Sequence, residues 1–503
     1  MEAEYVPIKT SDKASWIYFF RQVLVVLVLW TSYIIGGLNL GTPTVAIPQL
    51  RKEANSTAAV SDAVASWMTS TTGYSGSICI FIIVPIGHYL GRKFTIKVIF
   101  MSTLISSSII YFSKSAMHII ISQMILGLTA AAQTSVFLLT LTEYSSPKYR
   151  GVFLTLKTAS VYWGMWVANA IGIFTHYKYI GLVGIFTSTY SLIISFIIPE
   201  SPYWLAYRGR YDECAVAHRW LKGVNEDAEE ELDVLVKSQK ELVKNFDSFQ
   251  SLRKYIQNCL IAIKQPDIFR PLLLCFLVTA LYNFLGKMVC AVYSIEMMKK
   301  LSSNQTTVYI GVLILDGFTV LGMYVGCGLS KIFKRRTLLL STSIIGTIFL
   351  FAMSIYLYLI KFSLLPENDY VIIAMLVVYS LAVCCGPLIL TISISAELLP
   401  MRFRSFCVLV YSIFNLILMS TTLKIAPYVF NMFGFHGAYL GFGVCSAICI
   451  TLVYKHIPET KDRTLHEIAE IFKPKGVKEE TTQSKLLNNT KKEKETGRTF
   501  LLS

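Results

Sequence analysis

Apolar residues along this chain gather into twelve long runs, which short polar segments separate. A helix needs about 20 mainly apolar residues to cross roughly 30 Å of hydrocarbon, and the runs have about that length. The pattern therefore predicts an all-α membrane protein with twelve transmembrane helices. The predicted spans are residues 17–39, 66–87, 95–113, 117–142, 152–175, 179–198, 271–298, 306–333, 337–360, 370–397, 404–426 and 434–457.

Charged motifs at the ends of the apolar runs occur twice, about 250 residues apart. A membrane protein built from two copies of a helical bundle places its substrate site between the copies, near the bilayer midplane. The repeat therefore predicts two six-helix halves and indicates a transporter. The repeated motifs are Gly91-Arg92-Lys93 with Lys334-Arg335-Arg336, Glu143 and Arg150 with Glu397 and Arg404, and Pro199-Glu200-Ser201-Pro202 with Pro458-Glu459-Thr460-Lys461.

Polar segments divide the chain into five predicted parts. The middle insert opens with Pro199 and Pro202, which end the preceding helix, and continues through an acidic, helix-like stretch at 225–232. The segment after about 472 is rich in Lys, Glu, Thr and Asn, which is typical of a disordered tail. The parts are a cytosolic N-terminus (1–16), an N-terminal half (17–198), a cytoplasmic helical insert (199–270), a C-terminal half (271–457) and a cytosolic tail (458–503).

The net charge of +15 is a signal of topology rather than of a nucleic-acid partner. Lys and Arg lie in short loops after the even-numbered spans and in the tail, and such loops face the cytoplasm in membrane proteins. Both termini are then cytosolic, in agreement with an even number of spans. The loops after helices 1 and 7 face outside, where the sequons at Asn55 and Asn304 predict glycosylation.

Several function classes are excluded by what the chain lacks. The apolar runs leave no room for a large soluble catalytic domain, and the sequence has no P-loop, no Gly-x-Ser-x-Gly elbow and no His or Cys spacing for a metal. The eleven cysteines lie mostly inside apolar runs without a CxxC pair, as small buried hydrophobes do. We therefore expect no enzyme, no cofactor and no metal site.

The repeated charges predict a gate on the cytoplasmic side. Carboxylates there end one helix and guanidinium groups begin the next, so inter-helix ion pairs can hold that side shut in one state and separate in the other. Only contacts that differ between states bias an equilibrium. The alternative is that these charges act as topology signals and helix caps. The predicted gate residues are Arg92, Glu143, Arg150, Glu200, Arg335, Arg336, Glu397, Arg404 and Glu459.

These motifs resemble the sugar porter family of the major facilitator superfamily, in the family's order over about residues 17–472. The end of helix 1, from Gly41-Thr42-Pro43 through Pro48-Gln49-Leu50, is most similar to insect facilitated trehalose and hexose transporters. The resemblance implies a twelve-helix transporter that works by alternating access and binds a sugar in a central cavity.

The chain departs from the family at the positions that read sugar hydroxyls. Thr158 stands where helix 5 of the family has a glutamine, and helix 7 has lost most of its amides. Ile392 and Leu416 replace the family's tryptophans in helices 10 and 11. Acidic residues of the cytoplasmic loops are replaced by His88 and Lys331. The polar residues that remain for the cavity are Thr158, Tyr282, Asn283, Tyr293 and Asn415.

Two ionisable residues lie inside apolar runs of the second half, Lys287 in helix 7 and Asp316 in helix 8. A charge near the bilayer centre is costly and usually faces a cavity or a partner. We predict that the two form a pair that lines the cavity in place of the lost amides. The alternatives are that either one extends to an interface or caps a distortion near Gly317.

The residues together favour a plasma-membrane facilitator of trehalose or a hexose, with a small sugar and the lipid bilayer as its partners. Proton-linked members of the family carry an aspartate in helix 1, and the corresponding stretch 36–41 has no carboxylate, so the resemblance implies that proton coupling is disfavoured. Two alternatives stay open: a transporter-like sugar sensor that does not transport, and a facilitator of a non-sugar polar solute that uses Lys287 and Asp316.

Overall fold

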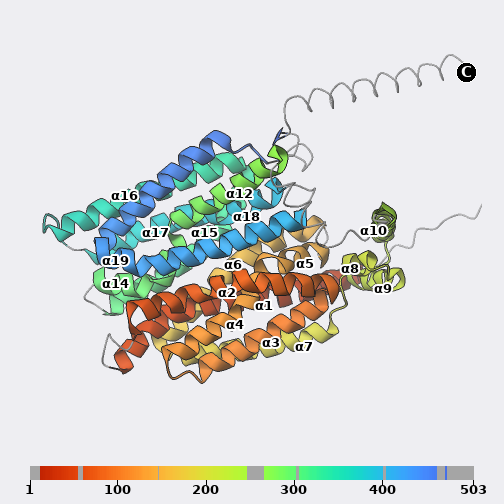
Figure 1. Ribbon diagram of the computed structural model, residues 1–503, viewed down its shortest axis with the longest axis horizontal. Coiled ribbons are helices and arrows are strands. Elements are labelled where there is room, and N and C mark those ends of the chain that lie inside the picture. The colour runs from red at the N-terminus through yellow and green to blue at the C-terminus, as the bar shows by residue number, and fades with distance from the viewer. Residues whose placement is uncertain are drawn as a thin grey trace, which may run out of the picture.

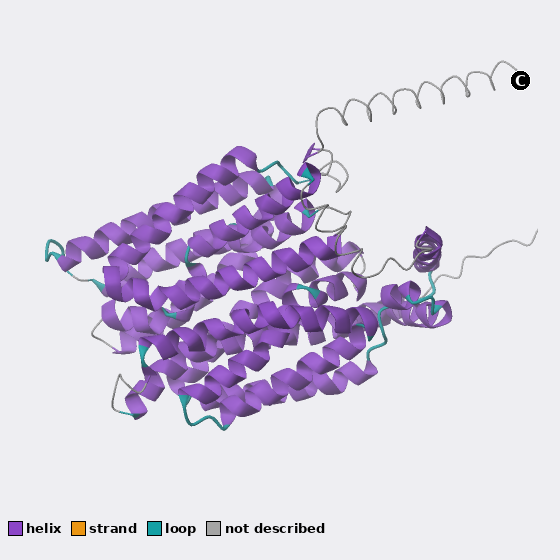
Figure 2. Cartoon of the chain, in the orientation of Figure 1, coloured by secondary structure: helices purple, strands orange, loops and turns teal. Residues whose placement is uncertain are grey.

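The computed structural model describes residues 12–54, 60–144, 147–245, 265–301, 305–366, 368–399, 404–461 and 471–472. Every regular element in these ranges is a helix (Figure 2). The long helices lie side by side in two bundles, one built from the first half of the chain and one from the second (Figure 1). The predicted all-α architecture in two halves is therefore confirmed.

The first bundle packs its helices in the pairs α1·α6, α2·α4 and α3·α7. The predicted span 117–142 is broken at Ser135, whose hydroxyl donates to the carbonyl of Ala131 at 2.6 Å and competes with the helical backbone. The helices are α1 (Asp12–Glu53), α2 (Asp62–Tyr89), α3 (Arg92–Tyr111), α4 (Ala116–Thr134), α5 (Val136–Tyr144), α6 (Pro147–Phe174) and α7 (Lys178–Ile197).

The second bundle repeats this packing with the pairs α12·α19, α15·α17 and α16·α19. Its spans also break, at Gly386 before Pro387 and at Gly286. Gly286 has φ +74°, which favours glycine, and a Cβ there would lie 3.2 Å from the ring of Phe442. The helices are α12 (Pro266–Phe284), α13 (Lys287–Val292), α14 (Ser294–Leu301), α15 (Gln305–Ile332), α16 (Arg335–Lys361), α17 (Asp369–Cys385), α18 (Pro387–Leu398) and α19 (Arg404–His456).

The element α19 joins the last two predicted spans. Its helix continues through residues 427–433, predicted as a loop, and changes direction at Gly434, where φ is 69° and ψ is 176°. Within the described ranges ten helical stretches are long and apolar enough to cross a membrane, and α19 is counted among them once. With α19 as two passages, and with α6 beside α1, the twelve predicted passages are accounted for.

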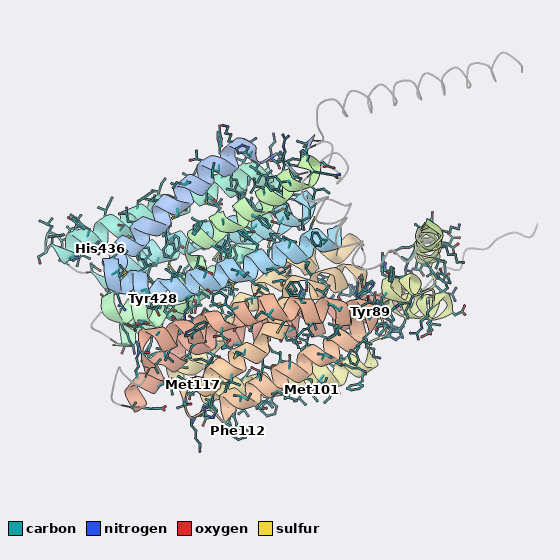
Figure 3. All side chains as sticks on the ribbon, viewed as in Figure 1. Tyr89, Met101, Phe112, Met117, Tyr428 and His436 are labelled. Atoms are coloured by element: carbon teal, nitrogen blue, oxygen red, sulfur yellow. The ribbon has the colours of Figure 1, made fainter. Side chains whose placement is uncertain are left out.

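Large apolar side chains cover the outside of the bundles. Met101, Phe112 and Met117 point away from the first bundle with 51%, 71% and 61% of their surface exposed (Figure 3). A water-soluble protein rarely leaves such contiguous apolar surface open, whereas hydrocarbon solvates it without cost. The exposed belt therefore faces lipid.

The insert between the halves forms three short helices beyond one end of the first bundle (Figure 1). They are α8 (Pro202–Tyr207), α9 (Tyr211–Lys222) and α10 (Glu226–Asn245), and they share a small core around Trp204, Cys214 and Leu232. Arg21 of α1 donates to the carbonyl of Trp220 at 3.1 Å, which attaches the insert to the bundle. We name this end of the molecule the insert end, and the other the far end.

Candidate functional site

A cavity of about 220 Å³ lies between the two bundles. Helices α1, α2, α4 and α6 line it from the first half, and α12, α13, α18 and α19 line it from the second. Its polar side chains come from both halves, as in a site between two repeats. These side chains belong to Tyr33, Asn39, Thr72, Gln123, Thr129, Gln133, Thr134, Lys157, Thr158, Tyr162, Tyr282, Asn283, Thr391, Tyr411 and Asn415.

Four residues that the sequence places in the cavity line it in the structure: Thr158, Tyr282, Asn283 and Asn415. The amide nitrogen of Asn283 donates to the carbonyl of Thr279 at 2.9 Å, and its buried oxygen Oδ1 has no partner. A buried acceptor without a partner costs about 1–3 kcal/mol, which a solute hydroxyl would recover.

The residues that replace the family's two tryptophans lie in the walls of the cavity. Ile392 and Leu416, which stand at the tryptophan positions, both line the cavity. Aliphatic side chains there fill volume without offering a ring face or an N–H donor. The aromatic rings in the cavity lining are therefore those of tyrosines, namely Tyr33, Tyr162, Tyr282 and Tyr411.

Two glutamines of the first half are cavity residues that the sequence analysis missed. Gln123 donates to the carbonyl of Asn39 at 2.9 Å and accepts from the hydroxyl of Thr72. Gln133 donates to the carbonyl of Ser32 at 2.7 Å. Both amides lie within the apolar run 117–142, and a polar residue inside such a run was the available signal.

A pair of tyrosines joins the halves at the cavity. The hydroxyls of Tyr162 in α6 and Tyr282 in α12 lie 2.9 Å apart. Both rings are largely buried, so this hydrogen bond forms away from bulk water, where it is stronger. It connects the halves at the wall of the cavity.

The predicted pair of Lys287 and Asp316 is wrong. The ammonium of Lys287 donates to the hydroxyl of Thr319 at 2.7 Å and to that of Ser380, inside the second half. Asp316 instead accepts from the amide of Asn169 in α6 at 2.6 Å. Neither lines the cavity. Helix α6 packs against α15 and places the amide of Asn169 next to Asp316, so the carboxylate accepts from a neutral donor rather than from Lys287.

Tyr293 lies outside the cavity lining and joins the halves on the far-end side of it. Its hydroxyl is 2.8 Å from that of Thr69 in α2 and donates to the carbonyl of Leu423 at 3.1 Å. Tyr293 directly follows α13, so this contact links the second half to α2 of the first half.

An ion-pair network closes the far end. Arg51 at the end of α1 pairs with Asp62 at 2.9 Å and, across the boundary between halves, with Glu296 in α14 at 3.4 Å. Asn431 of α19 donates to Asp62 at 2.7 Å, which is a second link between the halves. We call these four residues the far-end latch. The latch was not predicted from the sequence, because its three charged residues and one amide lie in segments that are far apart in the chain.

At the insert end, the repeated charges of the first half hold its own helices together. Arg92 binds Glu143 through two hydrogen bonds, at 2.7 and 3.0 Å. Glu200 accepts from the backbone amides of Arg92 and Lys93 at 2.7 and 3.1 Å, and so caps the start of α3. A carboxylate at a helix N-terminus is favoured by the exposed amides and the helix dipole.

The second half repeats this arrangement. Arg335 pairs with Glu397, and Glu459 accepts from the backbone amides of Arg335 and Arg336 at 3.1 and 3.2 Å. Arg336 donates to the carbonyl of Tyr454 at 2.7 Å. Seven of the predicted gate residues are therefore brought together in two matching clusters, each within one half.

Four of the predicted residues have no described side chain. The side chains of Arg150 and Arg404, at the starts of α6 and α19, lie outside the described part of the structure. The sequons at Asn55 and Asn304 also lie outside the described residues.

Two repeated helical bundles around a cavity that both of them line, with ion pairs between them at one end, define a membrane transporter of the major facilitator type. The chain belongs to the family described as sugar (and other) transporters, whose model matches residues 19–472.

Similar proteins agree with this family. The chain is 23% identical over 464 residues to a facilitated trehalose transporter of Apis mellifera ligustica, covering 92% of this chain and 90% of that protein. It is 24% identical over 460 residues to one of Drosophila yakuba, covering 90% of this chain but only 52% of that protein, so the chain spans about half the length of that relative.

Among solved structures, the fold is similar to that of a proton:xylose symporter, XylE, with bound 6-bromo-6-deoxy-D-glucose. The TM-score is 0.71 at 14% identity, and the match covers 90% of this chain and 100% of that one. An inward open structure of XylE from E. coli gives a TM-score of 0.68, also at 14% identity, with the same coverage. These likenesses support the fold.

Proposed function

We propose that this chain carries a small sugar, a hexose or trehalose, down its gradient across the plasma membrane by alternating access. Both termini and the insert end lie in the cytosol in this proposal, because the loops rich in Lys and Arg are at that end. The observation that supports it most is a cavity between two repeated bundles that receives hydroxyl and amide side chains from both, with the bundles ion-paired to each other at the far end. The similarity to insect trehalose transporters supports the sugar class.

The cavity offers groups suited to hydroxyls. Asn283 presents an unpartnered acceptor, and Asn415 and Thr158 line the opposite walls from α19 and α6. An amide binds two hydroxyls at once, as donor and acceptor, which is the pattern that a sugar presents. A volume of about 220 Å³ is below the roughly 300–1,000 Å³ of sites for drug-sized ligands, which favours a solute of monosaccharide size.

Facilitated movement fits the ionisable groups around the site. Among the described residues that line the cavity there is no carboxylate to exchange a proton with the solute. Asp316, the nearest candidate by sequence, is bound to Asn169 and lies outside the lining.

The test is uptake of radiolabelled glucose and trehalose into oocytes that express the chain, with surface expression measured and external pH varied. We expect saturable uptake of at least one sugar, with little change between pH 5.5 and 7.5. Absence of uptake at normal surface expression would overturn transport of a sugar and favour the sensor alternative. Uptake that collapses at high pH would overturn the facilitative mechanism alone.

A further inference from the structure

Lys157 in α6 is a buried lysine that lines the cavity. Among the described residues that line the cavity there is no carboxylate to pair with it. Lys157 is 6% exposed, and its Nζ lies 5.3 Å from the centre of the Tyr33 ring. Among the described residues no hydrogen bond or ion pair reaches that Nζ. Lys157 sits inside the apolar run 152–175, one residue before Thr158, and the sequence analysis passed over it.

Lys287, the other buried lysine among the described residues, has hydrogen-bond acceptors for its ammonium. Lys287 has hydroxyls of Thr319 and Ser380 as acceptors, and Asp316 lies one helical turn from Thr319. Lys157 has an aromatic ring beside it, which offsets only part of the cost of burying an ammonium. A desolvated ammonium is costly unless an opposite charge and hydrogen-bond acceptors accompany it.

The acceptors that Lys157 lacks can come from the cavity. Helix α6 packs against α1, and Lys157 lines the cavity between the halves. A neutral sugar hydroxyl would accept a hydrogen bond there but would leave the charge uncompensated. An anionic group would supply both the hydrogen-bond acceptor and the opposite charge, in a charge-assisted hydrogen bond about twice as strong as a neutral one.

We propose that the solute of this cavity carries an anionic group that pairs with Lys157, and that it is a polyhydroxylated carboxylate of monosaccharide size, such as a hexuronate. The carboxylate would face Lys157 and the ring hydroxyls would face Asn283 and Asn415. This inference rests on the proposed transport of a small sugar-like solute and names its class. It also gives the lysine a role in selecting the solute.

The test compares D-glucuronate with D-glucose, because the two share a ring and differ by the carboxylate at one end. Uptake and cross-competition are measured in oocytes for the wild type, Lys157→Gln, Lys157→Arg and the control Lys97→Gln. Lys97 in α3 lies over the Phe196 ring at 4.1 Å and does not line the cavity. Surface expression of each variant is measured in the same cells.

We expect the wild type to take up glucuronate with a KM about tenfold or more below that for glucose, the range of one charge-assisted contact. Lys157→Gln should raise the KM for glucuronate by a larger factor than the KM for glucose, so that the ratio of the two KM values falls to about one. Lys157→Arg should keep the preference, and Lys97→Gln should match the wild type.

The outcomes separate this inference from the proposed function. Saturable glucose uptake that glucuronate does not inhibit in the wild type would overturn the anionic solute and leave sugar transport standing. An equal loss of both substrates in Lys157→Gln would assign Lys157 to structure and overturn its role in selection. Uptake of neither compound by wild type at the surface would overturn both proposals. The wild-type comparison needs no variant and therefore decides even if Lys157→Gln misfolds.

Discussion

Arg51 at the end of α1 is ion-paired to Glu296 in α14 at 3.4 Å, across the boundary between the two halves. By contrast, the Arg92–Glu143 pair at the other end joins two helices of the same half. Only a contact that is made in one state and lost in the other biases the equilibrium between them. We therefore predict that the far-end latch biases opening directly and that the repeated clusters do not, because their contacts stay within one half.

Glu296→Gln is expected to shift the population toward opening at the far end. Partly exposed ion pairs contribute about 0.2–1 kcal/mol, so the ratio of open to closed molecules should rise about 1.5- to 5-fold. Hydrogen exchange of the amides in α13 and α14 measures this opening. Glu53→Gln is the matched control, because Glu53 pairs with His176 at 2.6 Å at the same end but within one half. Equal exchange in the two variants would show that the latch carries no bias.

The Tyr162–Tyr282 hydrogen bond predicts that substitutions of the two tyrosines have non-additive effects on stability. Tyr162→Phe and Tyr282→Phe should each remove the bond at a cost of about 0.5–1.5 kcal/mol. The double variant should be little worse than either single one, because the bond can be lost only once. Thermal unfolding in detergent and the KM for the transported solute are the readouts. Strictly additive effects would mean that each hydroxyl has a separate role.

Gly91→Ala is expected to disrupt the cap on α3. Gly91 has φ +97°, and a Cβ there would run into the carboxylate of Glu200, which holds the first amides of the helix. Strain of about 1–3 kcal/mol and the loss of a cap worth about 0.5–2 kcal/mol should lower the unfolding temperature. Gly209→Ala separates the two effects, because Gly209 has φ +74° with nothing near its Cβ position. Equal destabilisation by both variants would contradict the role of Glu200.

The burial of His218 in α9 predicts that the stability of the insert depends on pH. It is buried with neither ring nitrogen partnered, and burial, with Lys222 and Arg219 nearby, lowers its pKa to about 4, although Glu231 and Glu229 act in the opposite direction. The unfolded histidine titrates near pH 6.5, so between pH 6.5 and 4 the unfolded insert binds more protons than the folded one. The stability of the insert should therefore fall as the pH falls through this window.

Hydrogen exchange of α8–α10, corrected for its intrinsic pH dependence, measures that loss. We expect faster opening at pH 5 than at pH 7.5 in the wild type and a much weaker dependence in His218→Phe. His118→Phe is the control, because His118 is exposed and lies at the far end, next to Ser115. An unchanged dependence in His218→Phe would assign the effect to other groups.

Much of the architecture followed from the sequence by itself. Twelve apolar runs and the twofold motifs predicted the two bundles, because the need to bury backbone polar groups in lipid acts locally along each run. The resemblance to the sugar porter family, matched residue by residue, predicted Thr158, Tyr282, Asn283 and Asn415 at the cavity, and all four line it.

The partners of side chains were decided by the tertiary structure. Asp316 meets Asn169, Lys287 meets Thr319, and Arg51 meets Glu296, each through a crossing of two helices that are distant in the chain. Breaks at Ser135, Gly286 and Gly386 rotate the helix segments that follow them, so periodicity along a run no longer tells which way a side chain points. Apolar patterning determines that a helix spans the membrane, but the packing angle of its neighbours determines whether a lysine such as Lys157 faces lipid, another helix or the cavity.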